Sequence, residues 1–599
     1  MSFFFQSYME LLRNLVGRSA KPRNGIFDAI SEVIEKGKYV LLSAPPGYGK
    51  TMIPYTFAYF ATKFDEIPFM RVIHVLPLRS IIEDVYGRIR DANINELSDP
   101  VIGRQMMHVH EAPYLQKIYV ITTIDTFIMS LAKLPPREIQ KVALGKSYGY
   151  GEFVRASIFS SVIVFDEIQL FLEEGEKLPA VFLASIIYLA KMRIPMVLMS
   201  ATFPYKMIVH VRREIENRIG NKTKVVIFRY GETFKDDAFE NEHLSKRMTT
   251  KIEEVTNENE INVLIDRVLQ FVETYDRVLV VLNNVHRAKA LAENLIREQN
   301  LKAILLHGRL RGIDREIRLK KIRESKWVAI ATQVVEAGVD ISCQAMITDV
   351  AGITALIQRA GRFLRRKKDE EGELVIIVNK DKINDELAYG IYPHDLVKKT
   401  VEVLKKKINE QGFYINWHLP RILKEKAIGY EDIIDEIYSQ ISLPIEQASG
   451  WISCMLNVLE CKDTRDVYDI LWGIFKGSFT RDYPLSIAIV VDDYDEFRNE
   501  VPYDYLIKYV EKNSFPISLH DLKRFYKRNL LGVFYNVYDP EQSKFKVQPL
   551  KEALGDINKG RHLERKMLRI LKPGKKTLFG VLIPFSIYKK EYDVEVLSE

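Results

Sequence analysis

Cysteine is scarce in this chain: only Cys343, Cys454 and Cys461 occur among 599 residues, and their spacing is not that of metal ligands. Long apolar runs are also missing, because the longest, around residues 180–190, is well short of the roughly 18 residues that a membrane span needs. Residues 1–15 lack the basic segment and sustained apolar core of a signal peptide. We therefore expect no membrane helix, no membrane partner and a reducing, cytoplasmic location.

Excess charge is small as well, at +7 for the whole chain. Residues 501–599 contain 19 Lys and Arg against 12 Asp and Glu, so they carry all of the excess. Two interpretations stay open for this basic part: a local contact with phosphate or an acidic partner, or a solvated face. Within it, residues 523–528 (KRFYKR) interleave basic and aromatic side chains, which suits either nucleic-acid or partner binding, or a small domain with buried aromatics.

The composition is that of a folded protein of several domains, with 47% apolar and 28% charged residues. Short apolar runs alternate with helical patterns, which predicts parallel sheets with crossover helices. The first series of predicted strands lies at residues 38–43, 71–76, 118–122, 162–165 and 196–199. The second series lies at residues 278–282, 302–306, 328–331, 345–347 and 373–378.

We therefore predict an α/β protein with two parallel-sheet lobes and a C-terminal accessory region that is mainly helical. A polar stretch separates the two series of strands and is interpreted as a linker. The predicted parts are an N-terminal segment at 1–20, lobe 1 at 21–230, the linker at 231–260, lobe 2 at 261–385 and the accessory region at 386–599.

A glycine-rich loop at residues 44–51 (APPGYGKT) follows the first predicted strand and precedes a helical pattern. In such a loop, backbone N–H groups wrap phosphates, a lysine reaches the β and γ oxygens and a hydroxyl ligates Mg²⁺. Ala44 replaces the first glycine of the strict pattern, a mild departure at the loop entry. The predicted nucleotide-binding residues are Pro46, Gly47, Tyr48, Gly49, Lys50 and Thr51, with Thr51 also a Mg²⁺ ligand.

Two adjacent carboxylates, Asp166 and Glu167, end the apolar run 162–165. We predict that Asp166 holds Mg²⁺ directly or through water and that Glu167 polarises the attacking water. The alternative is a surface acidic pair at a strand end.

A third motif in the second series contains Gln358, Arg362 and Arg365. At helical spacing the two arginines lie on one face, from which both could reach a γ-phosphate. The alternative is a basic surface helix that continues through residues 366–368.

Together these motifs resemble superfamily 2 helicases over residues 20–385. Further segments match that family in order: 76–79 (LPLR), 122–125 (TTID), 200–202 (SAT), 281–284 (VLNN), 306–309 (LHGR) and 331–340 (ATQVVEAGVD). Residues 331–342 and 356–365 resemble the CRISPR-associated helicase of type I interference. The resemblance implies tandem RecA-like lobes, ATP and Mg²⁺ as cofactors, and ATP-dependent 3′ to 5′ translocation on single-stranded DNA that unwinds the target.

The resemblance also implies roles for individual residues. Those implied to hold the nucleic-acid strand are Pro77, Arg79, Thr122, Thr123, Asp125, Asn283, His307 and Thr332. Those implied to couple ATP to the strand are Gln169, Ser200 and Thr202, while Gly338 and Asp340 are implied to contact the nucleotide. Taken one at a time, Ser and Thr residues at strand ends are also common as turn or cap residues.

The implied partners are single-stranded target DNA, a separate HD nuclease subunit as in subtype I-A, and the crRNA-guided surveillance complex (Cascade). Many relatives carry an N-terminal HD nuclease, for which the loop at Ala44 leaves no room, so we expect the nuclease on another polypeptide. The alternative is a metal site built from His394-Asp395, His520-Asp521, His418 and His562.

Two departures from the family pattern leave alternative functions possible. Gln169 stands where the family commonly has histidine, and Ile26 stands where a glutamine usually reads adenine, a role that could pass to Gln6. The rivals are a scaffold subunit with a vestigial ATPase and a general DExH-type RNA or DNA helicase.

Overall fold

The computed structural model describes residues 2–106, 109–173, 175–220, 224–322, 324–336, 339–385, 389, 392–409, 414–422, 427–447, 449–480, 487–491, 500–502, 509–510, 512–517, 533–539, 544–549, 578–583 and 585–593. The chain divides into two compact units. The first unit consists of Met1–Arg137, Gly149–Asn257 and Glu336–Thr464, and the second of Glu138–Tyr148, Glu258–Val335 and Arg465–Glu599.

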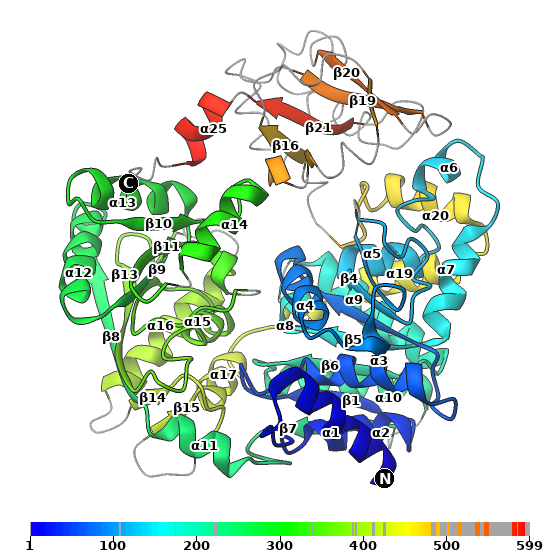
Figure 1. Ribbon diagram of the computed structural model, residues 1–599, viewed down its shortest axis with the longest axis horizontal. Helices are drawn as coiled ribbons and strands as arrows, with labels where there is room; N and C mark the ends of the chain where they lie inside the picture. The colour runs from blue at the N-terminus through cyan, green and yellow to red at the C-terminus, as the bar shows by residue number, and fades with distance from the viewer. Residues whose placement is uncertain are drawn as a thin grey trace. The chain divides into compact units, whose positions relative to one another are not determined.

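A seven-stranded sheet forms the centre of the first unit, with the order β3-β4-β2-β5-β6-β1-β7. Figure 1 labels β1, β4, β5, β6 and β7 of this sheet. All of its strand pairs are parallel. Its inner strands are mostly apolar and buried along their length, as expected for a parallel sheet covered on both faces. The strands are β1 (Tyr39–Ser43), β2 (Arg71–Leu76), β3 (Ile102–Gln105), β4 (Tyr119–Thr123), β5 (Ser161–Asp166), β6 (Met196–Ser200) and β7 (Val225–Arg229).

Helices connect these strands, and α2 and α3 pack on β1 and β2. The helices up to residue 219 are α1 (Ser2–Val16), α2 (Ile26–Ile34), α3 (Met52–Lys63), α4 (Arg79–Asp91), the 3₁₀ turn Asn95–Leu97, α5 (Ile124–Leu131), α6 (Ile139–Ala143), α7 (Tyr150–Phe159), α8 (Gln169–Leu172), α9 (Lys177–Lys191) and α10 (Tyr205–Ile219). Of these, α6 belongs to the second unit.

The register brings the carboxyl ends of three strands of the first sheet to one edge. Ser43 of β1 pairs with Ser200 of β6, and Asp166 of β5 pairs with Met199 of β6. Ligands of open α/β sheets bind beyond the carboxyl ends of the strands, so this edge is the expected site.

A second sheet has six strands in the order β10-β11-β9-β12-β13-β8. The pairings β10–β11, β11–β9, β12–β13 and β13–β8 are parallel. Its strands are β8 (Arg247–Val255), β9 (Arg277–Val281), β10 (Ala303–Leu306), β11 (Trp327–Ala331), β12 (Ala345–Asp349) and β13 (Glu371–Asn379). The accompanying helices are α11 (Asp237–Leu244), α12 (Glu260–Thr274), α13 (Val285–Arg297), α14 (Gly312–Lys321), the 3₁₀ turn Gln333–Val335 and α15 (Ile353–Ala360).

The two parallel sheets confirm the predicted fold class, and every predicted strand is present with its ends within two residues of the prediction. Strands β3, β7 and β8 were not predicted. Strand β8 and helix α11 lie in the polar stretch interpreted as a linker. Only two of the nine side chains of β8 are buried, so this strand at the sheet edge has no apolar run to reveal it.

Helices dominate the accessory region up to residue 473, as predicted. They are α16 (His394–Asn409), α17 (Tyr430–Tyr438), α18 (Pro444–Gln447), α19 (Ser449–Glu460) and α20 (Thr464–Gly473), with the strand pair β14 (Tyr414–Asn416) and β15 (Ala427–Gly429). Nowhere in the described residues is there a helix with both the length and the apolarity to cross a membrane.

Beyond residue 480 the second unit contains a six-stranded mixed sheet, which the sequence analysis did not predict. Its order is β17-β20-β19-β21-β16-β18. Its strands are widely spaced along the chain and form no regular alternating series. The elements are β16 (Ile487–Val491), β17 (Glu500–Pro502), β18 (Ser514–Ile517), β19 (Val533–Asp539), β20 (Lys544–Pro549), β21 (Leu578–Ile583) and α25 (Phe585–Tyr592).

Candidate functional site

The glycine-rich loop joins β1 to α3 at the carboxyl edge of the first sheet. Gly47 and Gly49 have φ angles of 76° and 100°, a region that glycine adopts without strain. No atom lies within 4 Å of the position that a Cβ would take at either residue, so the loop backbone can be approached closely. The Tyr48 side chain is buried, and its hydroxyl donates to the carbonyl oxygen of Asn24 at 2.9 Å. That side chain anchors the loop and leaves phosphate binding to the backbone.

Lys50 lies within the loop. Its Nζ donates to the carbonyl oxygens of Ala44 at 2.9 Å and Pro45 at 3.3 Å. Burial lowers the pKa of Lys50, and the charges of Glu167 and Asp166 oppose that shift. The loop thus combines a buried cation with backbone N–H groups, which is an environment that favours phosphate.

The two predicted carboxylates stand at the end of β5. Asp166 Oδ1 accepts from the backbone N–H of Glu167 at 2.9 Å, and Asp166 Oδ2 is 3.5 Å from Nε2 of the buried His74. Glu167 has a φ of 53°, a strained conformation for a residue with a side chain. Burial raises the pKa of Glu167, as does Asp166, while Lys50 opposes the shift. A raised pKa suits a general base.

A chain of hydrogen bonds links Glu167 to the Ser-Ala-Thr segment (residues 200–202, here called the coupling segment), which begins at the last residue of β6. Gln169 Nε2 donates to Glu167 Oε2 at 2.9 Å, and Gln169 Oε1 accepts from the hydroxyl of Ser200. Ser200 Oγ also accepts from the backbone N–H of Thr202 at 3.0 Å. Gln169, the departure from the family pattern, therefore uses both ends of its amide to connect the carboxylate pair with the predicted coupling residues.

The arginine motif begins on α15. Arg359 is fully buried, donating to Glu336 Oε1 at 2.9 Å and to Thr348 Oγ1 at 2.8 Å. Arg362 Nη2 donates to the carbonyl oxygen of the same Glu336 at 3.0 Å. Gln358 is buried, and neither atom of its amide has a hydrogen-bond partner among the described residues. Arg359 thus anchors the segment that presents Arg362.

Arg365 and Asp340, both predicted to contact the nucleotide, lie together in the first unit. Arg365 Nε is 3.3 Å from Asp340 Oδ1. Burial lowers the pKa of Arg365, and Asp340 opposes the shift. The charge of Arg365 adds to the burial that lowers the pKa of Lys50, so the two cations repel each other. Gly338 lies outside the described residues.

These residues fit ATP and Mg²⁺. The hydroxyl of Thr51 makes no capping hydrogen bond at the start of α3, and together with an Asp166 carboxylate oxygen it offers the hard oxygen ligands that Mg²⁺ prefers. The backbone at Gly47 and Gly49 has space where a side chain would stand. An anion near Lys50 would relieve its repulsion with Arg365.

Two of the residues predicted to hold a nucleic-acid strand, Thr122 and Thr123, have hydrogen-bond partners within the first unit. Thr122 is buried, and its hydroxyl donates to the carbonyl oxygen of Gln105 at 2.6 Å. Thr123 caps α5, its hydroxyl accepting from the N–H of Thr126 at 3.4 Å. The other predicted strand-contacting residues of this unit, which are partly or fully exposed, are Pro77, Arg79 and Asp125.

His307, in the second unit, lies under the C-terminal helix α25. Its Nε2 donates to the carbonyl oxygen of Tyr592 at 2.7 Å, and its Nδ1 accepts from the N–H of Arg309 at 3.1 Å. Burial lowers the pKa of His307 to about 3, so the ring is neutral. Thr332 is buried beyond the end of β11, and Asn283 is partly exposed beyond β9.

The histidines considered for a nuclease site have structural partners. His394 Nε2 lies 2.9 Å from the carbonyl oxygen of Ile383, and His418 Nε2 lies 2.7 Å from that of Phe363. No group of three or more His, Cys, Asp or Glu side chains arranged for a metal occurs among the described residues. The remaining residues of these predictions, outside the described ones, are His520, Asp521, His562 and the basic segment 523–528.

The structure also describes Ile26, which stands where the family usually has a glutamine that reads adenine, and Gln6, which could take over that role. Ile26 is fully buried at the start of α2, whereas Gln6 is exposed on α1.

Sequence reasoning missed several residues of this region. A histidine inside the apolar run 71–76 is a usable signal for His74, and Arg359 lies within the helicase motif at residues 356–365. Tyr430 and Glu431, at the start of α17, contact the same sheet edge. They belong to none of the motifs, so the sequence offered no signal for them.

Two family models match this chain over the regions just described. Residues 27–210 match the model for DEAD/DEAH box helicases, and residues 274–368 match the model for the C-terminal part of the CRISPR-associated nuclease/helicase Cas3. The first match contains the glycine-rich loop and the carboxylate pair, and the second contains the arginine motif.

Curated relatives agree with these models. The putative CRISPR-associated nuclease/helicase Cas3 of Methanocaldococcus jannaschii is 26% identical over 450 residues, which are 68% of this chain and 53% of the relative. The CRISPR-associated helicase Cas3 of Thermoproteus tenax is 24% identical over 418 residues, 66% of each chain. The chain thus spans about half the length of the first of these relatives.

Solved structures share the fold. The crystal structure of T. fusca Cas3 with AMPPNP superimposes with a TM-score of 0.60 at 16% identity, covering 96% of this chain and 68% of that one. A chain of a CRISPR RNA-guided surveillance complex, pre-nicking, superimposes with a TM-score of 0.53 at 17% identity, covering 91% of this chain and 64% of that one.

The two parallel sheets and the ordered helicase motifs are those of superfamily 2 helicases. Within that class, the family models and the relatives show that the chain is similar to the Cas3 family of CRISPR-associated helicases.

Proposed function

We propose that this chain hydrolyses ATP, with Mg²⁺, to move 3′ to 5′ along single-stranded DNA and to unwind target DNA in CRISPR type I interference. The observation that carries the proposal is the hydrogen-bonded chain from Glu167 through Gln169 to Ser200, which begins beside Lys50. An ATPase that is stimulated by a nucleic-acid strand needs a general base next to the phosphate loop and a connection from that base to the strand site. Glu167 has a raised pKa and is hydrogen-bonded through Gln169 to the coupling segment, residues 200–202.

Each ATP-site residue has one task in this proposal. Thr51 and Asp166 hold Mg²⁺, which would neutralise charge on the β- and γ-phosphates. Lys50 binds the β- and γ-phosphate oxygens. Glu167 accepts the proton of the attacking water, and the Arg362 and Arg365 guanidinium groups stabilise the charge of the transferring phosphoryl group.

Gln169, Ser200 and Thr202 then connect hydrolysis with the strand. The proton accepted by Glu167 alters the carboxylate that Gln169 Nε2 binds, and Gln169 passes the change to Ser200. This connection supports a working ATPase over a vestigial one, because Gln169 forms a hydrogen bond with Glu167 on one side and with Ser200 on the other.

Polarity and strand type are tested together by unwinding of duplexes with a single-stranded tail. Labelled DNA duplexes with a 3′ or a 5′ tail, and matching RNA duplexes, are incubated with ATP, Mg²⁺ and either the wild type or Lys50→Ala. The proposal expects wild-type unwinding of 3′-tailed DNA alone and none by the variant. Unwinding from the 5′ tail would overturn the proposed polarity, and a preference for RNA duplexes would favour a general RNA helicase. The same extent of unwinding by the wild type and Lys50→Ala would favour a scaffold with a vestigial ATPase.

The proposed partners are the crRNA-guided surveillance complex and an HD nuclease on a separate polypeptide. The Thermoproteus tenax relative is named a helicase alone, and one structural neighbour belongs to a surveillance complex, which supports both. The purified chain should therefore leave single-stranded DNA intact in Mn²⁺ or Ni²⁺. Cleavage by the purified wild type would contradict a separate nuclease.

A further inference from the structure

Helix α17 lies outside both segments that the family models match, and no role was predicted for it. Its first two residues are nevertheless buried: Tyr430 is 0% exposed and Glu431 is 1% exposed. Burying a hydroxyl or a carboxylate is costly unless it is paired. The partners of these two residues therefore indicate what the helix holds in place.

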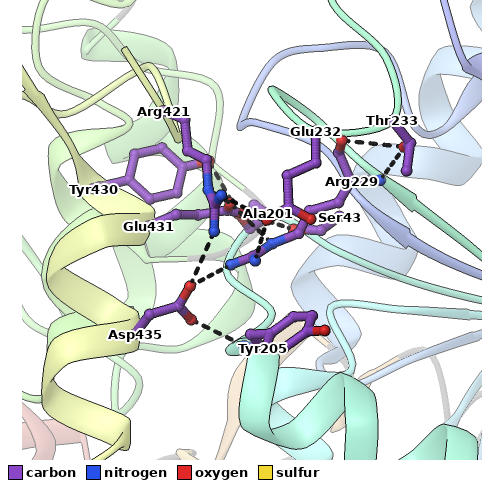
Figure 2. Close-up of polar contacts among 10 residues, drawn as sticks. All are labelled: Ser43, Ala201, Tyr205, Arg229, Glu232, Thr233, Arg421, Tyr430, Glu431 and Asp435. Carbon is purple, nitrogen blue, oxygen red and sulfur yellow. Dashed lines mark hydrogen bonds and ion pairs between the residues drawn. The ribbon is translucent and has the colours of Figure 1, made fainter. Parts of the chain in front are cut away.

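Tyr430 contacts the coupling segment (Figure 2). Its hydroxyl donates to the carbonyl oxygen of Ala201 at 3.0 Å. Ala201 is the middle residue of the Ser-Ala-Thr segment, which Gln169 connects to Glu167. Burial raises the pKa of the Tyr430 phenol, and the charges of Glu431 and Glu167 raise it further, so the hydroxyl keeps its proton and remains a donor.

Glu431 contacts the strand that leads into the glycine-rich loop. Its Oε1 accepts from the hydroxyl of Ser43, the last residue of β1, at 3.0 Å. Its Oε2 lies 3.0 Å from Nε of the buried Arg229 at the end of β7. Arg229 Nη2 also pairs with Asp435 Oδ2 at 2.7 Å, one helical turn beyond Glu431 (Figure 2).

Asp435 continues the same face of the helix. Its Oδ1 accepts from the backbone N–H of Tyr205 at 3.0 Å, where α10 begins after the coupling segment. A second arginine, Arg421, lies with its Nη2 3.3 Å from Asp435 Oδ2. One face of α17 therefore contacts the last residues of β1 and β7 and the residue that follows β6, at the edge of the sheet that holds the ATP-site residues.

We propose that Tyr430 and Glu431 are positioning residues for ATP hydrolysis: they fix Ala201 and Ser43, and through these the place of Glu167 and of the glycine-rich loop. The inference rests on the proposed function. The competing explanation is a buried polar cluster that only stabilises the fold. Breaking such a cluster costs stability without a specific loss of turnover.

Two matched substitutions separate these explanations. Tyr430→Phe removes one buried hydroxyl at the sheet edge. Tyr39→Phe removes an equally buried hydroxyl, bonded to the carbonyl oxygen of Ala190 at 3.1 Å, at the opposite end of β1. For the full chain, the DNA-stimulated kcat, the KM for ATP and the melting temperature are measured.

Tyr430→Phe should lower kcat about five- to tenfold, with KM changed by less than about twofold. Tyr39→Phe should keep the wild-type kcat with a comparable fall in melting temperature. Wild-type kcat in Tyr430→Phe, with the same fall in melting temperature as Tyr39→Phe, would overturn the inference and leave the proposed function intact.

A second measurement does not depend on turnover. Hydrogen exchange of residues 427–438 is followed with and without AMP-PNP and Mg²⁺. Nucleotide should slow this exchange in the wild type and change it less in Tyr430→Phe. Unchanged exchange in a wild type that binds the nucleotide would overturn the inference, whereas a wild type that neither binds nor hydrolyses ATP would overturn the proposed function and the inference with it.

Discussion

The predicted ATP-site residues act on one another, whereas three of the residues predicted to contact nucleic acid, Thr122, Thr123 and His307, form hydrogen bonds within the protein. The charges of both Glu167 and Arg365 act on the pKa of Lys50, and Lys50 in turn acts on the pKa of Glu167. Thr122 and His307, by contrast, are buried and hydrogen-bonded to backbone carbonyl groups. The same kind of motif evidence thus led to a connected site in one case and to scattered positions in the other.

The difference follows from topology. Parallel strands end at one edge, so residues placed directly after β1, β5 and β6 must lie close together whatever the loops do. The residues predicted to contact nucleic acid come from strand ends, helix starts and loops in both units, and their exposure depends on what packs over each of them. A hydroxyl at a strand end can be a cap or a phosphate contact, and sequence position does not distinguish the two.

Arg365 provides the largest expected effect. Arg365→Ala should lower the ATPase kcat by about 10³-fold, because a guanidinium beside the transferring phosphate contributes roughly that much or more. The neighbouring, exposed Arg366→Ala is the matched control and should keep the wild-type rate. Steady-state ATP hydrolysis with single-stranded DNA measures both, and equal rates for the two variants would remove Arg365 from the ATP site.

Gln169 tests whether the connection across the ATP site matters. Gln169→Ala removes two hydrogen bonds, to Glu167 and Ser200, and should lower the DNA-stimulated kcat by about 30-fold while ATP affinity stays the same. Ser185→Ala, which removes a buried hydrogen bond inside α9, should leave kcat unchanged. Stimulation by DNA that survives in Gln169→Ala would contradict the proposed coupling.

The residues predicted to contact single-stranded DNA should fall into two kinds: exposed residues that bind DNA and buried residues that stabilise the fold. Arg79→Ala should weaken binding of single-stranded DNA about three- to tenfold and make it less sensitive to salt, because an exposed cation is lost. Thr122→Val should instead lower the melting temperature and leave binding unchanged. Fluorescence anisotropy over a salt series tests this, and weaker DNA binding in Thr122→Val at an unchanged melting temperature would contradict the comparison.

The smallest effect is a pH dependence of stability at Glu173. Its carboxylate accepts from the hydroxyls of Tyr438 at 2.6 Å and Thr354 at 2.7 Å, and burial raises its pKa to about 7. Between about pH 4.5 and 7 the folded protein keeps a proton that the unfolded chain has lost, so the free energy of unfolding falls as pH rises, by at most about 3 kcal/mol.

The Glu173→Gln side chain has no carboxyl group and stays neutral between about pH 4.5 and 8. The melting temperature of this variant should therefore fall less than that of the wild type between pH 5 and pH 8, by a few degrees at most. Thermal unfolding at both pH values measures the difference. Parallel curves for the two proteins would show that Glu173 does not titrate in this range.

The sequence predicted the sheets and the residues at the ATP-side strand ends because apolar runs and glycine-rich loops are local patterns. It could not predict β8, whose mostly exposed side chains leave no apolar run, or the sheet beyond residue 480. It also missed Tyr430 and Glu431, which reach the site only because α17 folds back onto β1 and β6. Contacts of that sequence separation have no signature in a local window.

The most direct test of the account is steady-state ATP hydrolysis by the wild type and Glu167→Gln, each with no nucleic acid, with single-stranded DNA and with single-stranded RNA. The account predicts that DNA stimulates the wild type and that Glu167→Gln loses about 10²- to 10⁴-fold in rate while it still binds ATP. Hydrolysis that is unaffected by the substitution, or by DNA, would contradict it.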